Sequence, residues 1–150
     1  MAYLTGTGNP PLLMNVDTFA LGTGIAYQQS AGPFSFNGPY GVNIAAFDGT
    51  SENDATAQIT ADNNAGTFTG TGDINIDFVP TPGVPVSGTF TVTSNGRFPS
   101  TLTAASNTAD TALYIVNSGL ALVIETDDQQ VALGQIGTQA PQITRGRARK

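Results

Sequence analysis

TALYIVNSGLALVIETDDQQVALGQIGTQ, residues Thr111 to Gln139, is the densest apolar stretch of the chain. Three short apolar runs within it predict strands at Leu113–Val116, Leu120–Glu125 and Val131–Ile136. The polar segments between these runs predict two tight turns, because Asn, Ser, Gly and Asp favour turn conformations. We therefore expect three antiparallel strands here, and we expect the upstream chain to be built in the same way.

A second strand signal is the strict alternation in Thr67–Phe78, where polar residues are separated by apolar residues or glycine. Alternation with a period of two predicts a strand with one buried face and one solvated face. Its expected buried face carries Phe68, Gly70, Gly72, Ile74, Ile76 and Phe78. Val86–Thr93 alternates in the same way, and the following Asn95-Gly96 pair predicts a hairpin turn. Pro80, Pro82 and Pro85 predict a stiff loop between these two strands.

The sequence predicts an all-β fold of eight strands joined by short connections. The expected strands are 41–47, 55–61, 67–78, 86–93, 98–104, 112–116, 120–125 and 130–138. Short connections make sequence neighbours antiparallel, and such a meander can bury its apolar faces by closing into a small barrel with a lipocalin-like or avidin-like shape. Glycines on the apolar face would permit the tight coiling. A β-sandwich is the alternative. We expect an N-terminal extended arm and linker at 1–39, the barrel at 40–140 and a basic tail at 141–150.

The interior of the expected barrel mixes large apolar side chains with glycines. The inward set is predicted to include Phe68, Phe90, Ile74, Ile76, Leu122 and Ile124. Such a set is compatible either with a filled barrel or with one that keeps space for a ligand.

Composition and charge exclude several classes of function. Charged residues make up only 11% of the chain, and there is no Cys and no His. Without these residues there is no Ser-His or Cys-His nucleophile pair and no zinc site of the usual kind. Residues 1–144 contain eleven acids and one base, Arg97, so nucleic acid is an unsuitable partner. No apolar run is long enough to predict insertion into a membrane.

The remaining candidates for chemistry are carboxylates, and they are weak. Glu125, Asp127 and Asp128 gather at one expected hairpin and could join Asp17 or a loop carbonyl around a calcium ion. Acids on turns are more often solvated, so we expect no metal and no cofactor. An enzyme ranks last among the function classes, because the chain offers no base with a pKa near neutrality.

A partial internal repeat relates residues 17–33 to residues 128–141. Both segments contain an acid, an apolar-Ala-Leu-Gly group, a Gly/Ile segment, a Gln, and then Ala and Pro. The N-terminal arm is therefore interpreted as a second copy of the last strand, with chance similarity as the alternative. A spare copy of a strand could be offered to the sheet of a neighbouring chain, or it could pair with its own sheet. The expected self-association residues are Leu12, Leu13, Met14, Val16, Phe19, Leu21, Ile25, Tyr27, Val131, Leu133 and Ile136.

Several ordered segments resemble a β-rich repeat domain of large secreted or surface proteins of environmental bacteria such as acidobacteria. The segments are Thr60-Ala61-Asp62 with Thr69–Asn75, Gly88–Arg97, Tyr114–Val116 with Ala121–Asp127, and the Gln-rich Tyr27-Gln28-Gln29. The resemblance covers about residues 27–139 and departs from the pattern at 62–66, where a tight turn would be expected. The proline loop also looks longer than usual. The resemblance implies an extracellular or cell-surface location and a structural or adhesive role, and it supplies no catalytic residue.

The resulting functional expectation is a non-enzymatic extracellular module that self-associates through its N-terminal strand, head to tail into a fibre. Its expected partners are copies of itself, docked beside the last strand at Val131–Gln139. The alternative is a barrel that binds a small ligand, which requires a hollow interior.

Overall fold

A computed structural model describes residues 2–3, 11–16, 21–128 and 130–139 of the chain. The chain divides into two compact units, Met1–Ala31 and Gly32–Lys150. The boundary therefore lies after Ala31, whereas the sequence-based prediction put it after residue 39. Phe19 and the basic tail at 141–150 lie outside the described residues.

The N-terminal unit is a small antiparallel sheet of its own. It contains β1 (Ala2–Tyr3), β2 (Leu12–Val16) and β3 (Leu21–Ile25) in the order β1-β2-β3. β2 and β3 pair along their whole lengths, from Val16 opposite Leu21 to Leu12 opposite Ile25. The segment predicted as an extended arm thus has its strand hydrogen bonds satisfied largely within a hairpin.

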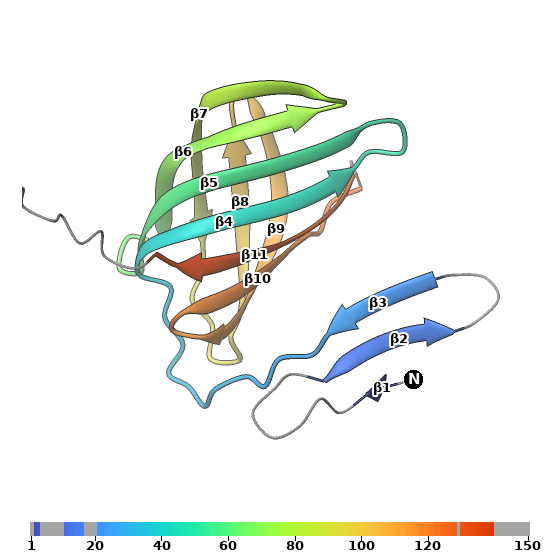
Figure 1. Cartoon of the computed structure of the whole chain (residues 1–150). Coiled ribbons are helices and arrows are strands. Elements are labelled where there is room, and N and C mark those ends of the chain that lie inside the picture. Colours follow the sequence, from blue (N-terminus) through green and yellow to red (C-terminus); the bar gives the residue numbers. More distant parts are fainter. Residues whose placement is uncertain (1, 4–10, 17–20, 129, 140–150) are drawn as a thin grey trace, which may run out of the picture. The chain divides into compact units, whose positions relative to one another are not determined.

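The second unit is a closed eight-stranded antiparallel barrel, as the alternation predicts (Figure 1). Its strands are β4 (Gly38–Phe47), β5 (Glu52–Asp62), β6 (Thr67–Ile76), β7 (Val79–Phe90), β8 (Arg97–Ala104), β9 (Asn107–Asn117), β10 (Leu120–Glu125) and β11 (Val131–Thr138). Each strand pairs with its sequence neighbours, and β11 pairs with β4 to close the ring. Within the described residues, no helix is long and apolar enough to cross a membrane.

The proline-rich segment is part of a strand, so its prediction as a stiff loop is wrong. β7 begins at Val79, and the turn before it is made by Asp77 and Phe78, both with positive φ (47° and 70°). Only Val86–Phe90 of β7 pairs with β8, and the Pro85 carbonyl oxygen accepts from the Ala105 N–H, so residues 79–84 have no strand neighbour on the β8 side. Proline is tolerated there because an edge strand loses no ladder hydrogen bond on its open side.

Three glycines on the inner face of β6 and β7 allow the barrel to coil tightly. A Cβ atom at Gly70 would overlap the Gln58 carbonyl oxygen, and one at Gly88 would overlap the Thr101 carbonyl oxygen and the ring of Phe68. Gly72 is similarly close to Ala57 on β5. Side chains at these positions would force the strands apart, so the predicted role of the glycines in coiling is supported.

The predicted inward face of β10 is wrong. Ala121 and Val123 are buried, and with Glu125 they face the interior, whereas Ile124 is 39% exposed on the outer face. Leu122 shares the outer face with Ile124 because the pleat alternates. Ile76, expected inside, is 45% exposed beyond a register shift in β6. Phe68 and Phe90 are buried as predicted.

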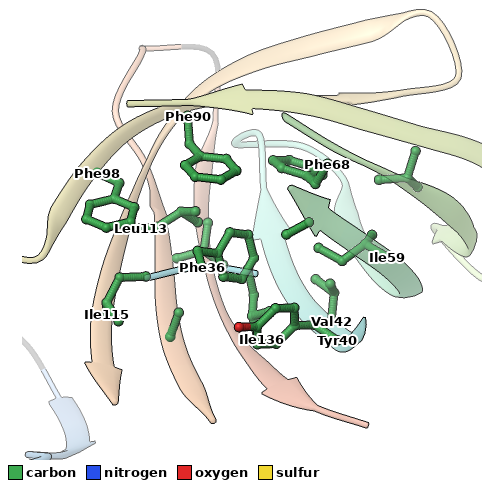
Figure 2. Close-up of a cluster of buried hydrophobic side chains, with 14 residues drawn as sticks. Phe36, Tyr40, Val42, Ile59, Phe68, Phe90, Phe98, Leu113, Ile115 and Ile136 are labelled. Carbon is green, nitrogen blue, oxygen red and sulfur yellow. The ribbon is translucent and has the colours of Figure 1, made fainter. Parts of the chain in front are cut away.

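Aromatic side chains fill one end of the barrel, which we call the closed end (Figure 2). At its centre is Phe36, which precedes β4 and is 1% exposed. Its ring centroid lies 4.5 Å from that of Tyr40 and 5.3 Å from that of Phe90. The backbone N–H of Phe36 donates to Asn63 Oδ1 in the β5–β6 turn, which fixes the segment in place. The sequence-based prediction had assigned Phe36 to a linker.

Candidate functional site

The opposite end of the barrel is not filled, and we call it the hollow end. β4 and β11 run from the closed end, where Tyr40 pairs with Thr138, to the hollow end, where Ala46 pairs with Ala132. Small side chains at this level leave two adjacent spaces. The first, the apolar hollow, has a volume of about 30 Å³, measured as the space open to the centre of a water-sized sphere. Its walls include Ile44, Ala55, Ala57, Ile74, Leu102 and Ala104.

The second space, the Glu125 hollow, has a volume of about 50 Å³ on the same measure. It is lined by Ile44, Leu102, Ala109, Thr111, Val123, Glu125, Gln130 and Ala132. Ile44, Leu102 and Thr111 line both spaces, so the two hollows are neighbours. Because about 10–15 Å³ on this measure holds one water, the two hollows have room for roughly two to five waters each or for a small organic group of similar size.

Glu125 is the one acidic side chain in the wall of its hollow, and it faces inward at the end of β10. The residue is 8% exposed, and neither carboxyl oxygen has a hydrogen-bond partner within the described part of the chain. A buried carboxylate without a partner is costly, because desolvation is not offset by hydrogen bonds or by an opposite charge. This carboxyl group is therefore available to a ligand that enters the hollow.

The pKa of Glu125 reflects this environment. Burial is the largest cause that raises its pKa, from 4.5 to about 7. The nearby carboxyl group of Asp127 raises it further, and the side-chain amide of Gln130 lowers it. The group consequently changes charge near neutral pH, so the sequence-based expectation that the chain offers no base with a pKa near neutrality is wrong.

The other polar groups around the hollow are engaged in the wall. The hydroxyl groups of Thr111 and Ser100 hydrogen-bond to each other at 2.7 Å between β9 and β8. Asp127 Oδ2 accepts from the backbone N–H of Asp110 at 2.7 Å, which ties the β10–β11 connection to β9. These contacts hold the wall in place. Gln130 also lines the hollow: its Oε1 accepts from Asn53 Nδ2 at 3.5 Å, and its amide is close enough to lower the pKa of Glu125.

Apolar side chains are exposed around the hollow end. Phe47 and Val131 face each other across β4 and β11 and are 53% and 76% exposed. On the β6–β7 turn, the side chain of Phe78 is 91% exposed. Its φ is 70°, a backbone conformation that bulky residues rarely adopt. Strained residues of this kind often occur beside binding sites.

The weak calcium candidates do not form a site. Among the described residues, no group of three or more acidic side chains converges in a way that could hold a metal ion. Glu125 faces the barrel interior, and Asp127 binds the backbone of Asp110. The sequence-based grouping of these acids at one hairpin overlooked the alternation of β10, which turns Glu125 inward.

The residues predicted for self-association lie in both units. In the N-terminal unit, Leu12, Leu13, Met14 and Val16 lie on β2, Leu21 and Ile25 on β3, and Tyr27 just after β3. Leu13 and Ile25 are 43% and 45% exposed.

In the barrel, Val131 and Leu133 are exposed, but Ile136 is 3% exposed in the interior and cannot contact another copy while the barrel is closed. The predicted docking of the arm beside β11 also requires correction, because β11 pairs with β10 on one side and β4 on the other.

Comparison with known proteins supports the fold. The chain matches no protein-family model and no curated protein. Among solved structures, it is similar to a de novo designed fluorescence-activating beta barrel, with a TM-score of 0.50 and 16% sequence identity. The match covers 70% of this chain and 94% of the designed chain. At this identity the similarity concerns the barrel fold alone.

Proposed function

We propose that the barrel is a non-enzymatic binding module for a small, mostly apolar molecule that carries one basic nitrogen. The observation that carries the proposal is the inward carboxyl group of Glu125, buried in a hollow without a hydrogen-bond partner among the described residues. The similarity in fold to a designed fluorescence-activating barrel is compatible with this function. This similarity in fold favours the alternative expectation from the sequence, a barrel that binds a small ligand.

The lining of the apolar hollow indicates that most of the ligand is apolar. Twelve of the sixteen residues that line the apolar hollow are Ile, Leu, Val, Phe or Ala, and the others are Thr56, Gly72, Asp73 and Thr111. Apolar cavities of this kind stay dry and accept small apolar molecules, since a water there would lack polar partners. Pockets for small ligands typically combine such walls with a few placed polar groups, and Glu125 is that group here.

The negative charge of the ionised Glu125 carboxyl group indicates that the ligand carries a basic nitrogen. Above pH 7 the Glu125 carboxyl group is mostly ionised, and an ammonium group would supply both hydrogen bonds and an opposite charge. An anionic ligand would instead place two negative charges in one low-dielectric space. The formal net charge of the chain, −6, also attracts cations to the barrel.

The test uses three small probes of similar size, namely ethylamine, ethanol and acetate, titrated at pH 8 and followed by amide NMR shifts. Ethylamine is expected to bind most tightly and to perturb Leu102, Val123 and Ala132. The Glu125→Gln variant is expected to lose the preference for the amine and to retain weak binding of the alcohol. Equal binding of all three probes to the wild-type chain, or no perturbation of the lining residues, would contradict the proposal. Glu52→Gln, at an exposed carboxyl group on β5, is the matched control.

A further inference from the structure

The N-terminal unit repeats the closing strands of the barrel in its backbone pairing. β2 and β3 pair through five residue pairs, from Val16↔Leu21 to Leu12↔Ile25. β10 and β11 also pair through five, from Ile124↔Leu133 to Leu120↔Gly137. In both hairpins the second strand begins its pairing with Leu-Gly, as Leu21-Gly22 and as Leu133-Gly134. The partial repeat seen in the sequence therefore corresponds to a repeat in register.

Hydrogen bonds beyond the paired residues extend the correspondence. One residue past the last pair, the N–H of Ala26 donates to the Pro11 carbonyl oxygen at 3.2 Å. At the equivalent place in the barrel, the N–H of Thr138 donates to the Gly119 carbonyl oxygen at 3.0 Å. The two hairpins thus share the same end as well as the same register.

The third strand of each unit also lies in the same place. β1 pairs with the start of β2, at Tyr3↔Leu12 and Ala2↔Leu13. β9 pairs with the start of β10, at Asn117↔Leu120 and Ile115↔Ala121. The order β1-β2-β3 therefore corresponds strand by strand to β9-β10-β11, including the alternate apolar residues. These residues are Leu12, Met14, Val16 and Leu21, matched by Leu120, Leu122, Ile124 and Leu133 of the outer barrel face. The inward residues Val123 and Ile136 are matched by Asn15 and Gly24, so the correspondence lies in the register and the outer face.

The two copies differ in what lies at their edges. In the barrel, eight residue pairs join β11 to β4 and eight join β9 to β8. Among the described residues, no strand pairs with β1 or β3 on the side away from β2. Unpaired strand edges attract further strands, because their N–H and C=O groups can extend the ladder.

We propose that β1–β3 is an interaction surface that takes the place of β9–β11 at the edge of an open sheet. The partner is the β4–β8 sheet of a second copy of this chain whose own closing strands have come away. In this complex β3 lies on β4 with the register of β11, so that Thr23, the equivalent of Gln135, faces Asn43. Because Thr111, Glu125 and Ala132 belong to the strands that come away, a ligand bound in the Glu125 hollow should stabilise the closed barrel and oppose this self-association.

Disulfide formation between two single-cysteine full-length chains tests the register, since the natural chain has no cysteine. One chain carries Thr23→Cys. The other carries Asn43→Cys together with Val123→Pro, which removes a donor and a buried side chain from the middle of β10 and opens the barrel. The two chains are mixed under mild oxidation, and the mixed disulfide is quantified by gel and mass spectrometry.

The expected result is a mixed disulfide that requires Val123→Pro. It should exceed by roughly tenfold the yield with Ala45→Cys in place of Asn43→Cys, because a shift of two residues moves the Cα atom by about 6.6 Å, out of disulfide reach. Equal yields at the two positions, or equal yields with the barrel intact, would overturn the proposal. Failure to form any mixed disulfide would overturn it as well.

Discussion

The interior of the barrel is filled at one end and partly empty at the other. At the closed end, Phe36 enters from outside the strand ladder and packs against Tyr40 and Phe90. At the hollow end, alanines and a carboxyl group face the interior instead. The same eight strands therefore form a tightly packed half, which stabilises the fold, and a hollow half, whose unfilled space and buried carboxyl group destabilise it. Substitutions of buried residues should therefore lower stability at the closed end and be better tolerated at the hollow end.

The largest effect is expected at the closed end. Phe36→Ala removes a fully buried ring and leaves a cavity among three aromatic neighbours, Tyr40, Phe68 and Phe90, so it should lower the free energy of unfolding by about 3–5 kcal/mol. Denaturant unfolding followed by near-ultraviolet circular dichroism measures the change. Phe36→Leu, which keeps most of the volume, is the control and should recover most of the loss.

The next effect is expected at Glu125 and depends on pH. Because its pKa is raised to about 7 in the folded chain, the native state holds a proton that the unfolded state has released above pH 4.5. Stability from this group is thus full below pH 4.5 and falls as the pH rises through 7, by up to about 3 kcal/mol. Unfolding curves between pH 4 and 9 should show this fall in the wild-type chain and in Glu52→Gln. A Glu125→Gln curve with the same slope would show that Glu125 is not the cause.

A smaller effect distinguishes packed from hollow positions on adjacent strands. Ala121 is 1% exposed and pairs with Ile136, whereas Ala132 lines the Glu125 hollow. Ala121→Val should overpack the interior and cost about 1–3 kcal/mol. Ala132→Val should grow into free space and change stability by less than about 1 kcal/mol. Similar losses in the two variants would mean that the hollow end is as tightly packed as the closed end.

The smallest effect concerns the turn beside the hollow. Phe78→Asn should leave stability unchanged or raise it by about 0.5–1 kcal/mol, because Asn tolerates the positive φ that Phe adopts there. The ring is 91% exposed, so little burial is lost. Phe47→Asn, on a regular strand, is the contrasting variant and should be destabilising. Thermal unfolding compares the two, and a larger loss at Phe78 would show that its ring makes stabilising contacts.

Sequence analysis predicted the barrel well where one face of a strand is polar. Thr67–Ile76 alternates clearly, so its strand and its inner glycines were identified. It failed on β10, because Leu120–Ile124 is apolar at every position and the pattern does not distinguish the two faces. That ambiguity concealed the inward orientation of Glu125, and with it the candidate site. The sequence signal for Glu125 was its position two and four residues after Val123 and Ala121, which places the three side chains on the same face of a strand.

The burial of Phe36 and the pairing of β2 with β3 were missed for a different reason. Phe36 lies in a segment rich in Gly, Pro and Ser without periodicity. Its ring is buried against aromatic residues distant in sequence, and its backbone N–H donates to Asn63 Oδ1. The repeat of residues 17–33 was detected, but only backbone pairing shows that β2 and β3 share the register of β10 and β11. Extracellular location and fibre formation stay predictions of the sequence.

The most direct test of the central claim is a pH titration of the Glu125 side-chain carboxyl carbon by NMR, with and without ethylamine. The account predicts a midpoint at about pH 7 in the free protein. Saturating ethylamine should lower this midpoint, because an ammonium group beside the carboxylate favours its ionised form. A midpoint near pH 4.5 that ethylamine does not move would contradict the account.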